Sequence, residues 1–165
     1  ATVLKGDRSK SSFLGVAYAG KGQYQDTGSK SILIGKNTSS VVNSKSICKD
    51  GGVTSYRGAV AINKSASNSA ASISCGSLIL DKESRAFTYP HNSVLNNNST
   101  LSHEATVGRI NPEHIFYLMA RGLDEESAIK MIVSGFIEPL VRELPLEYAV
   151  ELNRLIELEM DSKTG

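Results

Sequence analysis

Short apolar runs separated by polar clusters recur along the chain from Ala1 to Gly108. Each run spans about four residues, and Gly, Asn, Asp, Lys or Ser closes it. The runs lie in "SFLGVAYA" (12–19), "SILIGKNTSS" (31–40), "GAVAINKSASNS" (58–69), "SLILDKESRA" (77–86) and "SVLNNNSTLS" (93–102). This pattern predicts short strands joined by tight polar turns.

Three of the runs share one form, an apolar stretch followed by a polar residue, Lys and another polar residue: "ILIGKN", "AVAINKS" and "LILDKE". A degenerate repeat of short strands is typical of a solenoid or β-helix, and a β-sandwich is the alternative. We favour the solenoid because Ser, Ala, Gly and Asn stack from coil to coil, whereas a sandwich usually supplies more large inward residues. The regular return of Ile, Leu and Val argues against a disordered low-complexity segment.

A helical pattern begins where the apolar runs end. The stretch "NPEHIFYLMARG" (111–122) predicts a helix with Asn111 as its N-cap and Pro112 at the first helical position. Gly122 supplies a left-handed stop at the C-terminal end of this helix.

Two more helices follow the first. The second is predicted over residues 123–136, with Asp124 as its cap and Gly135 at its end. The third is predicted over residues 145–160.

The apolar faces of these helices have two possible uses. Ala128, Ile132 and Phe136 lie four residues apart and share one face. Such a face closes the open end of the β stack, or it presents a ridge or groove to a partner. The expected fold is mainly β with a C-terminal α part: a β-helix core at residues 1–108 and a helical domain at residues 109–165.

The charge differs between the two parts of the chain, although the net charge of the 165 residues is only +1. Residues 1–100 hold nine Lys and three Arg against four Asp and one Glu, a net +7. Residues 101–165 hold two Lys and four Arg against twelve acids, a net −6. The small total argues against a general nucleic-acid binder. The split predicts either two units that face different partners or two solvated surfaces of different composition.

Two cysteines, Cys48 and Cys75, are too few for a disulfide framework, and they lack the CxxC spacing of a zinc site. No stretch approaches the roughly 18 uninterrupted apolar residues of a membrane span, and the start lacks a signal-peptide core. We therefore expect a reduced, cytoplasmic protein without a membrane partner. Because "TVL" at the start is already strand-like, we expect the chain to be part of a longer protein.

The adjacent residues His103 and Glu104 are the sharpest candidate for metal chemistry. Imidazole and carboxylate are common ligands for iron and zinc. On a regular strand adjacent side chains point to opposite faces, so both serve one ligand only at a turn, at a bulge or across an interface with another chain. A surface His and Glu near a strand end is the alternative interpretation. Cys75 and Cys48 are candidate thiolate ligands or small buried hydrophobic residues.

Motifs for catalysis are absent from the sequence. "GKGQ" and "KDGG" lack the spacing of a phosphate-binding loop, and no GxSxG nucleophile elbow is present. A carbohydrate-active β-helix enzyme is an alternative, but residues 1–100 offer only five acidic side chains for a carboxylate pair and few aromatics to stack on sugars.

Several stretches resemble SufB, in the SufB/SufD family of the SUF iron–sulfur cluster assembly system. They are "QYQDTGSKSILIGKNTSS", "SKS", "TSYRGAV", "TYP", "LSHEATVGRI" and "IFYLMARGLDEESAIKMIVSGFIEPLVRELPLEYAVELNRLIELEM". They follow the order of the C-terminal part of that family and cover nearly the whole chain. The paralogous SufD branch typically carries Gly where this chain has Glu104, so "HEA" favours the SufB branch.

The resemblance implies a right-handed parallel β-helix followed by a helical domain, in a scaffold that is not an enzyme and that holds a transient iron–sulfur cluster. It implies that His103 and Glu104 are cluster or metal ligands at an interface with SufD or a second SufB. Cys75 is a further candidate ligand. Two departures matter: Thr2 and Ser84 stand where many family members carry cysteine, so the sulfur-accepting thiols must come from elsewhere.

The resemblance also implies that the helical domain binds the ATPase SufC. We expect Phe116, Arg121, Ile132 and Phe136 to contact it. The first alternative to the scaffold is a SufD-like subunit that binds partners but no cluster, and the second is the carbohydrate-active enzyme.

Overall fold

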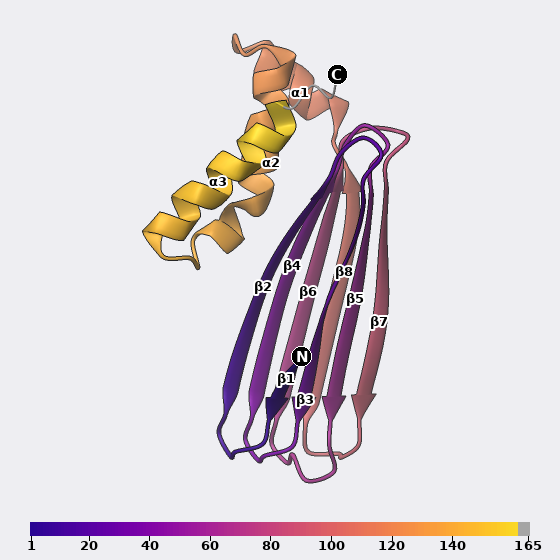
Figure 1. Ribbon diagram of the computed structural model, residues 1–165, viewed down its shortest axis with the longest axis vertical. Coiled ribbons are helices and arrows are strands. Elements are labelled where there is room, and N and C mark those ends of the chain that lie inside the picture. Colours follow the sequence, from indigo (N-terminus) through magenta and orange to yellow (C-terminus); the bar gives the residue numbers. More distant parts are fainter. Residues whose placement is uncertain (162–165) are drawn as a thin grey trace.

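The computed structural model describes residues 1–161, so residues 162–165 of the expected helical domain lie outside the described residues. Eight strands precede three helices (Figure 1). In chain order the elements are β1 (Thr2–Leu4), β2 (Lys10–Ala19), β3 (Tyr24–Leu33), β4 (Ser39–Cys48), β5 (Val53–Ile62), β6 (Ala70–Ile79), β7 (Arg85–Val94), β8 (Thr100–Arg109), α1 (Pro112–Met119), α2 (Glu125–Val141) and α3 (Leu146–Asp161).

The strands alternate between two parallel sheets, ordered β1-β3-β5-β7 and β2-β4-β6-β8. One strand from each sheet makes one coil, so the chain winds through about four coils. In the second sheet, for example, Ser39 pairs with Ala70 of the next coil, and Ala70 pairs with Thr100 of the coil after it. The predicted parallel β-helix followed by helices is therefore confirmed, and the sandwich alternative is wrong.

The turns of adjacent coils stack closely because they contain small residues and residues with a left-handed backbone conformation. Asn37 and Asn68 occupy equivalent corners with φ of 55° and 54°, a region that Asn tolerates better than most residues. A Cβ on Gly35 would lie 2.3 Å from the carbonyl oxygen of Gly6 in the preceding coil. Only glycine fits this close contact between backbones.

Seven of the strands contain ten residues, which is longer than the predicted apolar runs. Polar residues extend them. In β4, Ser44 and Ser46 are buried on the inward face, whereas Asn43 and Lys45 point outward. Hydrogen bonds between the hydroxyls of successive coils make this burial tolerable, as between Ser46 Oγ and Ser77 Oγ at 2.8 Å.

Two hydrophobic clusters hold the molecule together. The first lies between the sheets and contains Leu4, Leu33, Val42, Tyr56, Val60, Ile62, Ala66, Ala71, Ile73 and Cys75. The second lies between the outer face of the β2-β4-β6-β8 sheet and helices α2 and α3, and contains Ile47, Leu78, Val133, Ile137, Ile156 and Met160. The helices thus pack beside β2, β4 and β6 (Figure 1). The predicted closure of the open end of the stack by the helices is wrong. The helices pack instead against outward aliphatic residues of the β2-β4-β6-β8 sheet, such as Ile47 and Leu78.

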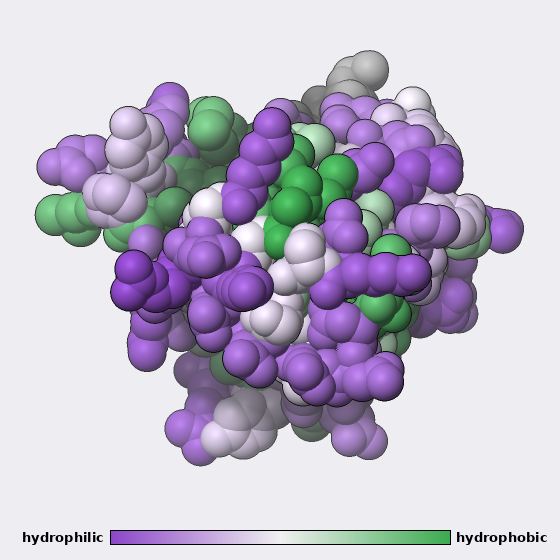
Figure 2. All heavy atoms as spheres, turned by 90° about the horizontal axis from the view of Figure 1, so that it is seen from below, coloured by the Kyte–Doolittle hydropathy of each residue, from purple (hydrophilic) through white to green (hydrophobic). Residues whose placement is uncertain are grey.

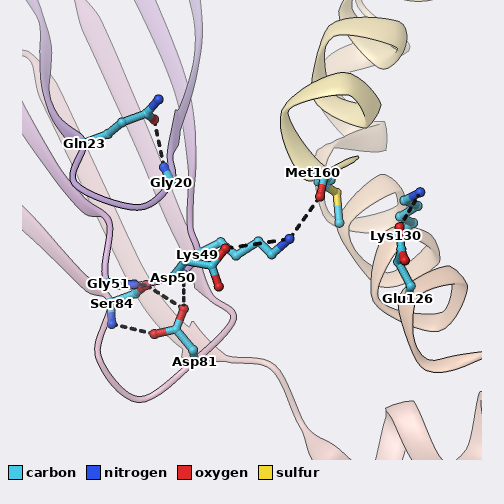
Figure 3. Close-up of polar contacts among 10 residues, drawn as sticks. All are labelled: Gly20, Gln23, Lys49, Asp50, Gly51, Asp81, Ser84, Glu126, Lys130 and Met160. Carbon is cyan, nitrogen blue, oxygen red and sulfur yellow. Dashed lines mark hydrogen bonds and ion pairs between the residues drawn. The ribbon is translucent and has the colours of Figure 1, made fainter. Parts of the chain in front are cut away.

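Lysine side chains on β4 and just after it also contact the helices. Lys49 Nζ, just past the end of the strand, donates a hydrogen bond to the carbonyl oxygen of Met160 at 3.0 Å, close to the C-terminal end of α3 (Figure 3). A cation is favourable there because the carbonyls of a last helical turn lack backbone partners. The Lys45 ammonium lies 4.4 Å from the centroid of the Phe136 ring.

The helix starts follow the prediction. Asn111 accepts a hydrogen bond from the Glu113 N–H at 2.9 Å, and Asp124 accepts one from the Ser127 N–H at 2.7 Å. Gly122 adopts the expected positive φ of 99°.

The predicted end of the second helix at Gly135 is wrong, because α2 continues through Pro139 to Val141. Burial of Ile137 and Leu140 on the packed face outweighs the weak helix preference of Gly and Pro. None of the helices in residues 1–161 combines the length and apolar content needed to cross a membrane.

Hydrophilic residues cover most of the end of the solenoid seen from below, and hydrophobic residues gather between them (Figure 2). This view agrees with the polar turns expected from the sequence. The buried apolar residues between the two sheets lie mostly on the strands.

Replacement of Ile47 tests the packing between the sheet and the helices. Ile47 has no exposed surface and lies in the second cluster, so Ile47→Ala is expected to lower the free energy of unfolding by about 2–5 kcal/mol. Val41→Ala on the same strand removes a side chain that is 42% exposed and serves as the control. Urea unfolding gives both values, and equal losses in the two variants would contradict this packing.

Candidate functional site

Cys75 and His103 face each other inside the last two coils. They come from neighbouring strands, β6 and β8, and both point inward. The Cys75 Sγ lies 3.8 Å from His103 Nε2. Parallel pairing produces this contact, because His103 is in register with Ile73 and so lies beside Cys75 two residues further along β6.

Asn92 on β7 orients the imidazole from its other side. Its Nδ2 lies 3.1 Å from His103 Nδ1. With the Asn92 amide donating, Nε2 carries the ring proton and directs it toward Cys75. The flipped orientation of the amide would place its oxygen against Nδ1–H and leave Nε2 with a lone pair for a metal. The tautomer of His103 therefore depends on which group of the Asn92 amide faces Nδ1.

The environment of the Cys75 thiol opposes its ionisation. Cys75 is only 5% exposed, and burial raises its pKa to about 11, although a hydrogen bond from Tyr56 acts in the opposite direction. The thiol is therefore protonated at neutral pH. A metal that binds Cys75 must displace this proton.

Glu104 does not join the pair. Strand β8 is regular at this point, so Glu104 points to the exposed outer face while His103 points inward. Within residues 1–161 no three His, Cys, Asp or Glu side chains come close enough to hold a metal together. Cys75 and His103 therefore offer two ligands.

The second thiol, Cys48, lies apart from this site in the interior. It has no exposed surface. Its sulfur lies 3.1 Å from Thr54 Oγ1 and 3.3 Å from the Arg85 carbonyl oxygen. Burial raises its pKa, and the Thr54 hydrogen bonds only partly oppose this effect. Cys48 therefore fits the interpretation of a small buried residue.

Ser84 stabilises a turn. Its hydroxyl donates to Asp81 Oδ2 at 2.7 Å and accepts from the Gly51 N–H at 3.1 Å (Figure 3). Asp81 also accepts from the backbone N–H groups of Asp50, Glu83 and Ser84 at 2.6, 2.9 and 2.7 Å. Ser84 is 2% exposed. The hydroxyl thus joins two consecutive coils.

Thr2 is an exposed residue of the short strand β1, where its backbone pairs with Ser31. Neither Thr2 nor Ser84 contacts the Cys75–His103 pair in the described contacts.

The four residues predicted to contact an ATPase do not share one surface. Phe116 on α1 is 74% exposed, and the Arg121 guanidinium lies over the Tyr117 ring at 4.7 Å. Ile132 and Phe136 on α2 are partly buried and pack against the cluster between the helices and the sheet. Of the four, only Phe116 and Arg121 are open to another protein in this arrangement.

Sequence reasoning missed two residues that act on the pair, Tyr56 through the pKa of Cys75 and Asn92 through its contact with His103. Tyr56 stands in "TSYRGAV", which contributed to the family resemblance but gave no local sign of a contact with a thiol. Asn92 lies in a stretch of ordinary polar strand residues. Their positions follow from the coil register, which no local motif reveals.

Comparisons of the chain with a family description and with individual proteins agree on one family. Residues 1–136 match the family described as "SUF system FeS cluster assembly, SufBD core domain". The chain is 50% identical over 165 residues to the iron–sulfur cluster assembly protein SufB of Bacillus subtilis, and the match covers 100% of the chain and 36% of that protein. It is 53% identical over 163 residues to an iron–sulfur cluster assembly SufBD family protein of Staphylococcus saprophyticus, covering 99% and 35%. A SufBD family protein of Mycobacterium leprae is 48% identical over 165 residues, covering 100% and 19%. The chain thus spans about a third of the first two relatives and about a fifth of the third.

The Asp81 turn predicts a pH-dependent contribution to stability. Burial by itself would raise the pKa of Asp81, but hydrogen bonds led by those from Ser84 hold it below its usual value of 3.8. Because the folded pKa is lowered, the contribution is present at neutral pH and is lost as the pH falls through the folded pKa. Asp81→Asn is expected to lower the free energy of unfolding by about 1–3 kcal/mol at pH 7.

Urea unfolding at pH 7 and near pH 3 checks this expectation, since the difference between Asp81→Asn and wild type shrinks in acid. Asp26→Asn breaks an exposed ion pair with Arg57 and is the control, with a much smaller expected loss because solvent screens such a pair. A difference for Asp81→Asn that stays constant with pH would contradict the role of the carboxylate charge.

Proposed function

Because this chain belongs to the SufBD core family of the SUF iron–sulfur cluster assembly system, we propose that it is part of a scaffold that holds a nascent iron–sulfur cluster. The observation that carries the proposal is the 3.8 Å approach of Cys75 Sγ to His103 Nε2. In this proposal residues 1–108 hold the cluster and residues 109–165 bind the ATPase. The scaffold itself is not an enzyme.

The chemistry of the two groups suits iron. A thiolate is a preferred ligand for iron–sulfur clusters, and a neutral imidazole is a common iron ligand. The contact with Asn92 supports this role, because it can fix the imidazole tautomer and ring orientation. The iron and sulfide are cargo that the scaffold later gives to other proteins.

The remaining ligands must come from outside the pair. Within the described chain β7 and β8 pair on one side only, so they form the open edge of the last coil. A partner chain docked at this edge, SufD or a second SufB, would add ligands opposite His103. Glu104 lies on the outer face of the same edge strand and would serve the cluster after a local rearrangement or through the partner.

The helical part is proposed to bind the ATPase SufC through α1 and the residues that follow it. Phe116 is an exposed aromatic residue of the kind that dominates protein interfaces. Arg121 with Tyr117 adds a cation and a further ring next to it. Ile132 and Phe136 would support this surface from behind, since they fasten α2 to the sheet.

Two observations favour a second candidate, a SufD-like subunit that binds partners but no cluster. Ser84 takes part in the turn instead of offering a thiolate, and the buried Cys75 thiol, whose pKa is raised, is protonated at neutral pH. The carbohydrate-active alternative has little support, because Asp81, the carboxylate beside Asp50, accepts backbone hydrogen bonds in a turn. The five acidic residues among residues 1–100 lie in turns or on outward faces, namely Asp7, Asp26, Asp50, Asp81 and Glu83.

Anaerobic reconstitution with ferrous iron and sulfide tests the scaffold. Wild type is expected to develop visible sulfur-to-iron absorption, and Cys75→Ser and His103→Ala are each expected to lose most of it, because each removes one ligand. Glu104→Ala is expected to have a smaller effect, since its side chain points outward.

Matched controls are available for both ligands. Cys48→Ser alters the other thiol, and His91→Ala removes an exposed histidine on β7. Both controls are expected to retain the absorption. Full absorption in Cys75→Ser would contradict the proposed site, and no absorption from the full-length wild type would favour the SufD-like candidate.

Replacement of Phe116 tests the ATPase contact. Phe116→Ala is expected to weaken binding of purified SufC by about tenfold or more, as loss of an interface anchor does. Its unfolding midpoint should stay that of wild type, because the side chain is exposed. Tyr24→Ala removes another exposed aromatic residue, on β3, and should bind normally. Isothermal titration calorimetry measures the affinities, and normal binding by Phe116→Ala would rule out this contact.

A further inference from the structure

The outer face of the β1-β3-β5-β7 sheet is left uncovered by the helices. Helices α2 and α3 pack on the other sheet and lie away from β5 and β7 (Figure 1). The register aligns outward residues of neighbouring strands in rows, Asp26 with Ser55 and Phe87, and Arg57 with Tyr89. The Phe87 and Tyr89 side chains remain 41% and 48% exposed. Exposed rings that lie together on an uncovered sheet face indicate a contact surface for another molecule.

The side chains of this face hold one another in place. The Phe87 and Tyr89 rings lie nearly parallel, with their centroids 6.4 Å apart. The central carbon of the Arg57 guanidinium lies 4.9 Å from the centroid of the Tyr89 ring, and Arg57 Nε donates to both carboxylate oxygens of Asp26 at 3.0 Å. Ser55 points outward between Asp26 and Phe87 but is only 1% exposed, because neighbouring side chains cover it. The face is therefore ordered before a partner arrives, which lowers the entropy cost of binding.

The charge of this face is complementary to an acidic partner. Its strands carry three outward cations, Lys30, Arg57 and Arg85, against one outward anion, Asp26, a net +2. Within residues 1–161, Lys30 and Arg85 have no ion-pair partner. The Asp26 contacts use the Nε group of Arg57, so the Nη groups are able to bind a second carboxylate. A complementary partner therefore carries carboxylates beside apolar groups.

The geometry of the rings favours a protein over a nucleic acid. Bases that bind on a sheet stack on free faces of aromatic rings. Here the Arg57 guanidinium covers one face of the Tyr89 ring, and the Phe87 ring lies nearly parallel beside it. Tyrosine and arginine are also the residues that contribute most often to the binding energy of protein interfaces.

We propose that this face docks an acidic protein that accepts the iron–sulfur cluster, with Tyr89 and Arg57 as its anchors. Strand β7 connects the face to the candidate site, since Tyr89 points outward while Asn92 points inward and contacts His103. The ATPase and the second scaffold subunit are proposed to bind at α1 and at the backbone edge of β7 and β8, which leaves the outward side chains of β5 free. The role of the partner as an acceptor rests on the proposed function, because it requires a scaffold that gives its cluster away.

Fluorescence anisotropy tests the docking of the full-length protein without any cluster. The probe is a labelled small apoferredoxin with a negative net charge at pH 7. Wild type is expected to bind it at low salt, and Tyr89→Ala and Arg57→Gln are each expected to weaken binding by about tenfold or more, as loss of an interface anchor does. Lys30→Gln is expected to weaken it by roughly threefold at low salt and to match wild type at about 1 M salt, because salt screens an exposed charge.

Matched controls remove the same side chains from other surfaces. Tyr148→Ala deletes an exposed ring on α3, and Lys64→Gln neutralises an exposed lysine in the turn between β5 and β6. Both controls are expected to bind the apoferredoxin as wild type does. The urea unfolding midpoints of all variants show whether a loss of binding comes from a loss of structure.

The outcomes separate this inference from the function on which it rests. If reconstitution of wild type with iron and sulfide fails, the acceptor role falls with the proposed function. If reconstitution succeeds but the apoferredoxin does not bind, or binds folded Tyr89→Ala and Arg57→Gln as tightly as wild type, this inference alone is overturned. Binding of a single-stranded thymidine oligonucleotide through Tyr89 in place of the apoferredoxin also overturns it. If Tyr89→Ala and Arg57→Gln do not fold, Lys30→Gln decides, and an affinity equal to wild type at low salt overturns the inference.

Discussion

Parallel pairing of each strand with its counterpart in the next coil is the constraint on which the rest of the structure depends. It repeats the backbone from one coil to the next, so side chains far apart in the sequence become neighbours on one face. The separation of 28 positions between Cys75 and His103 therefore corresponds to one step along the stack. A change of one residue in the register would turn His103 to the opposite face and separate the pair.

The alternation of side chains gives the two faces of the second sheet different roles. Inward positions of β6 carry Cys75, while the outward residue Gly76 lies beneath α2. A Cβ on Gly76 would lie 3.1 Å from the Lys45 side chain and 3.4 Å from the Phe136 ring. The helices therefore pack directly behind the strand that carries the thiol. The packing surface of the helices and the thiol of the candidate site are thus on opposite faces of one strand.

Polar side chains inside the solenoid matter for the candidate site as much as apolar side chains do. Buried hydroxyls are costly without partners, and here they bond from strand to strand, as Ser40 does to Ser31 at 2.9 Å. Among the described buried side chains, the Ser55 hydroxyl is the exception without a partner. An interior built in this way accommodates a thiol, a phenol and an imidazole side by side, which a purely aliphatic core would not.

The sequence by itself determined the class of fold, the helix starts at Asn111 and Asp124, the family, and the ligand candidates Cys75 and His103. Each of these depends on local chemistry or on short motifs that lie together in the chain. Only the tertiary structure decided that Phe136 faces the sheet and that Tyr56 and Asn92 act on the candidate ligands.

Those contacts depend on the length of each coil, which is not constant: Thr2 pairs with Ser31 in the first sheet, whereas Val53 pairs with the more distant Arg85. The pattern of apolar runs does not reveal that length. Ser, Asn and Lys extend the strands beyond the apolar residues, and only backbone pairing between coils fixes which of them align.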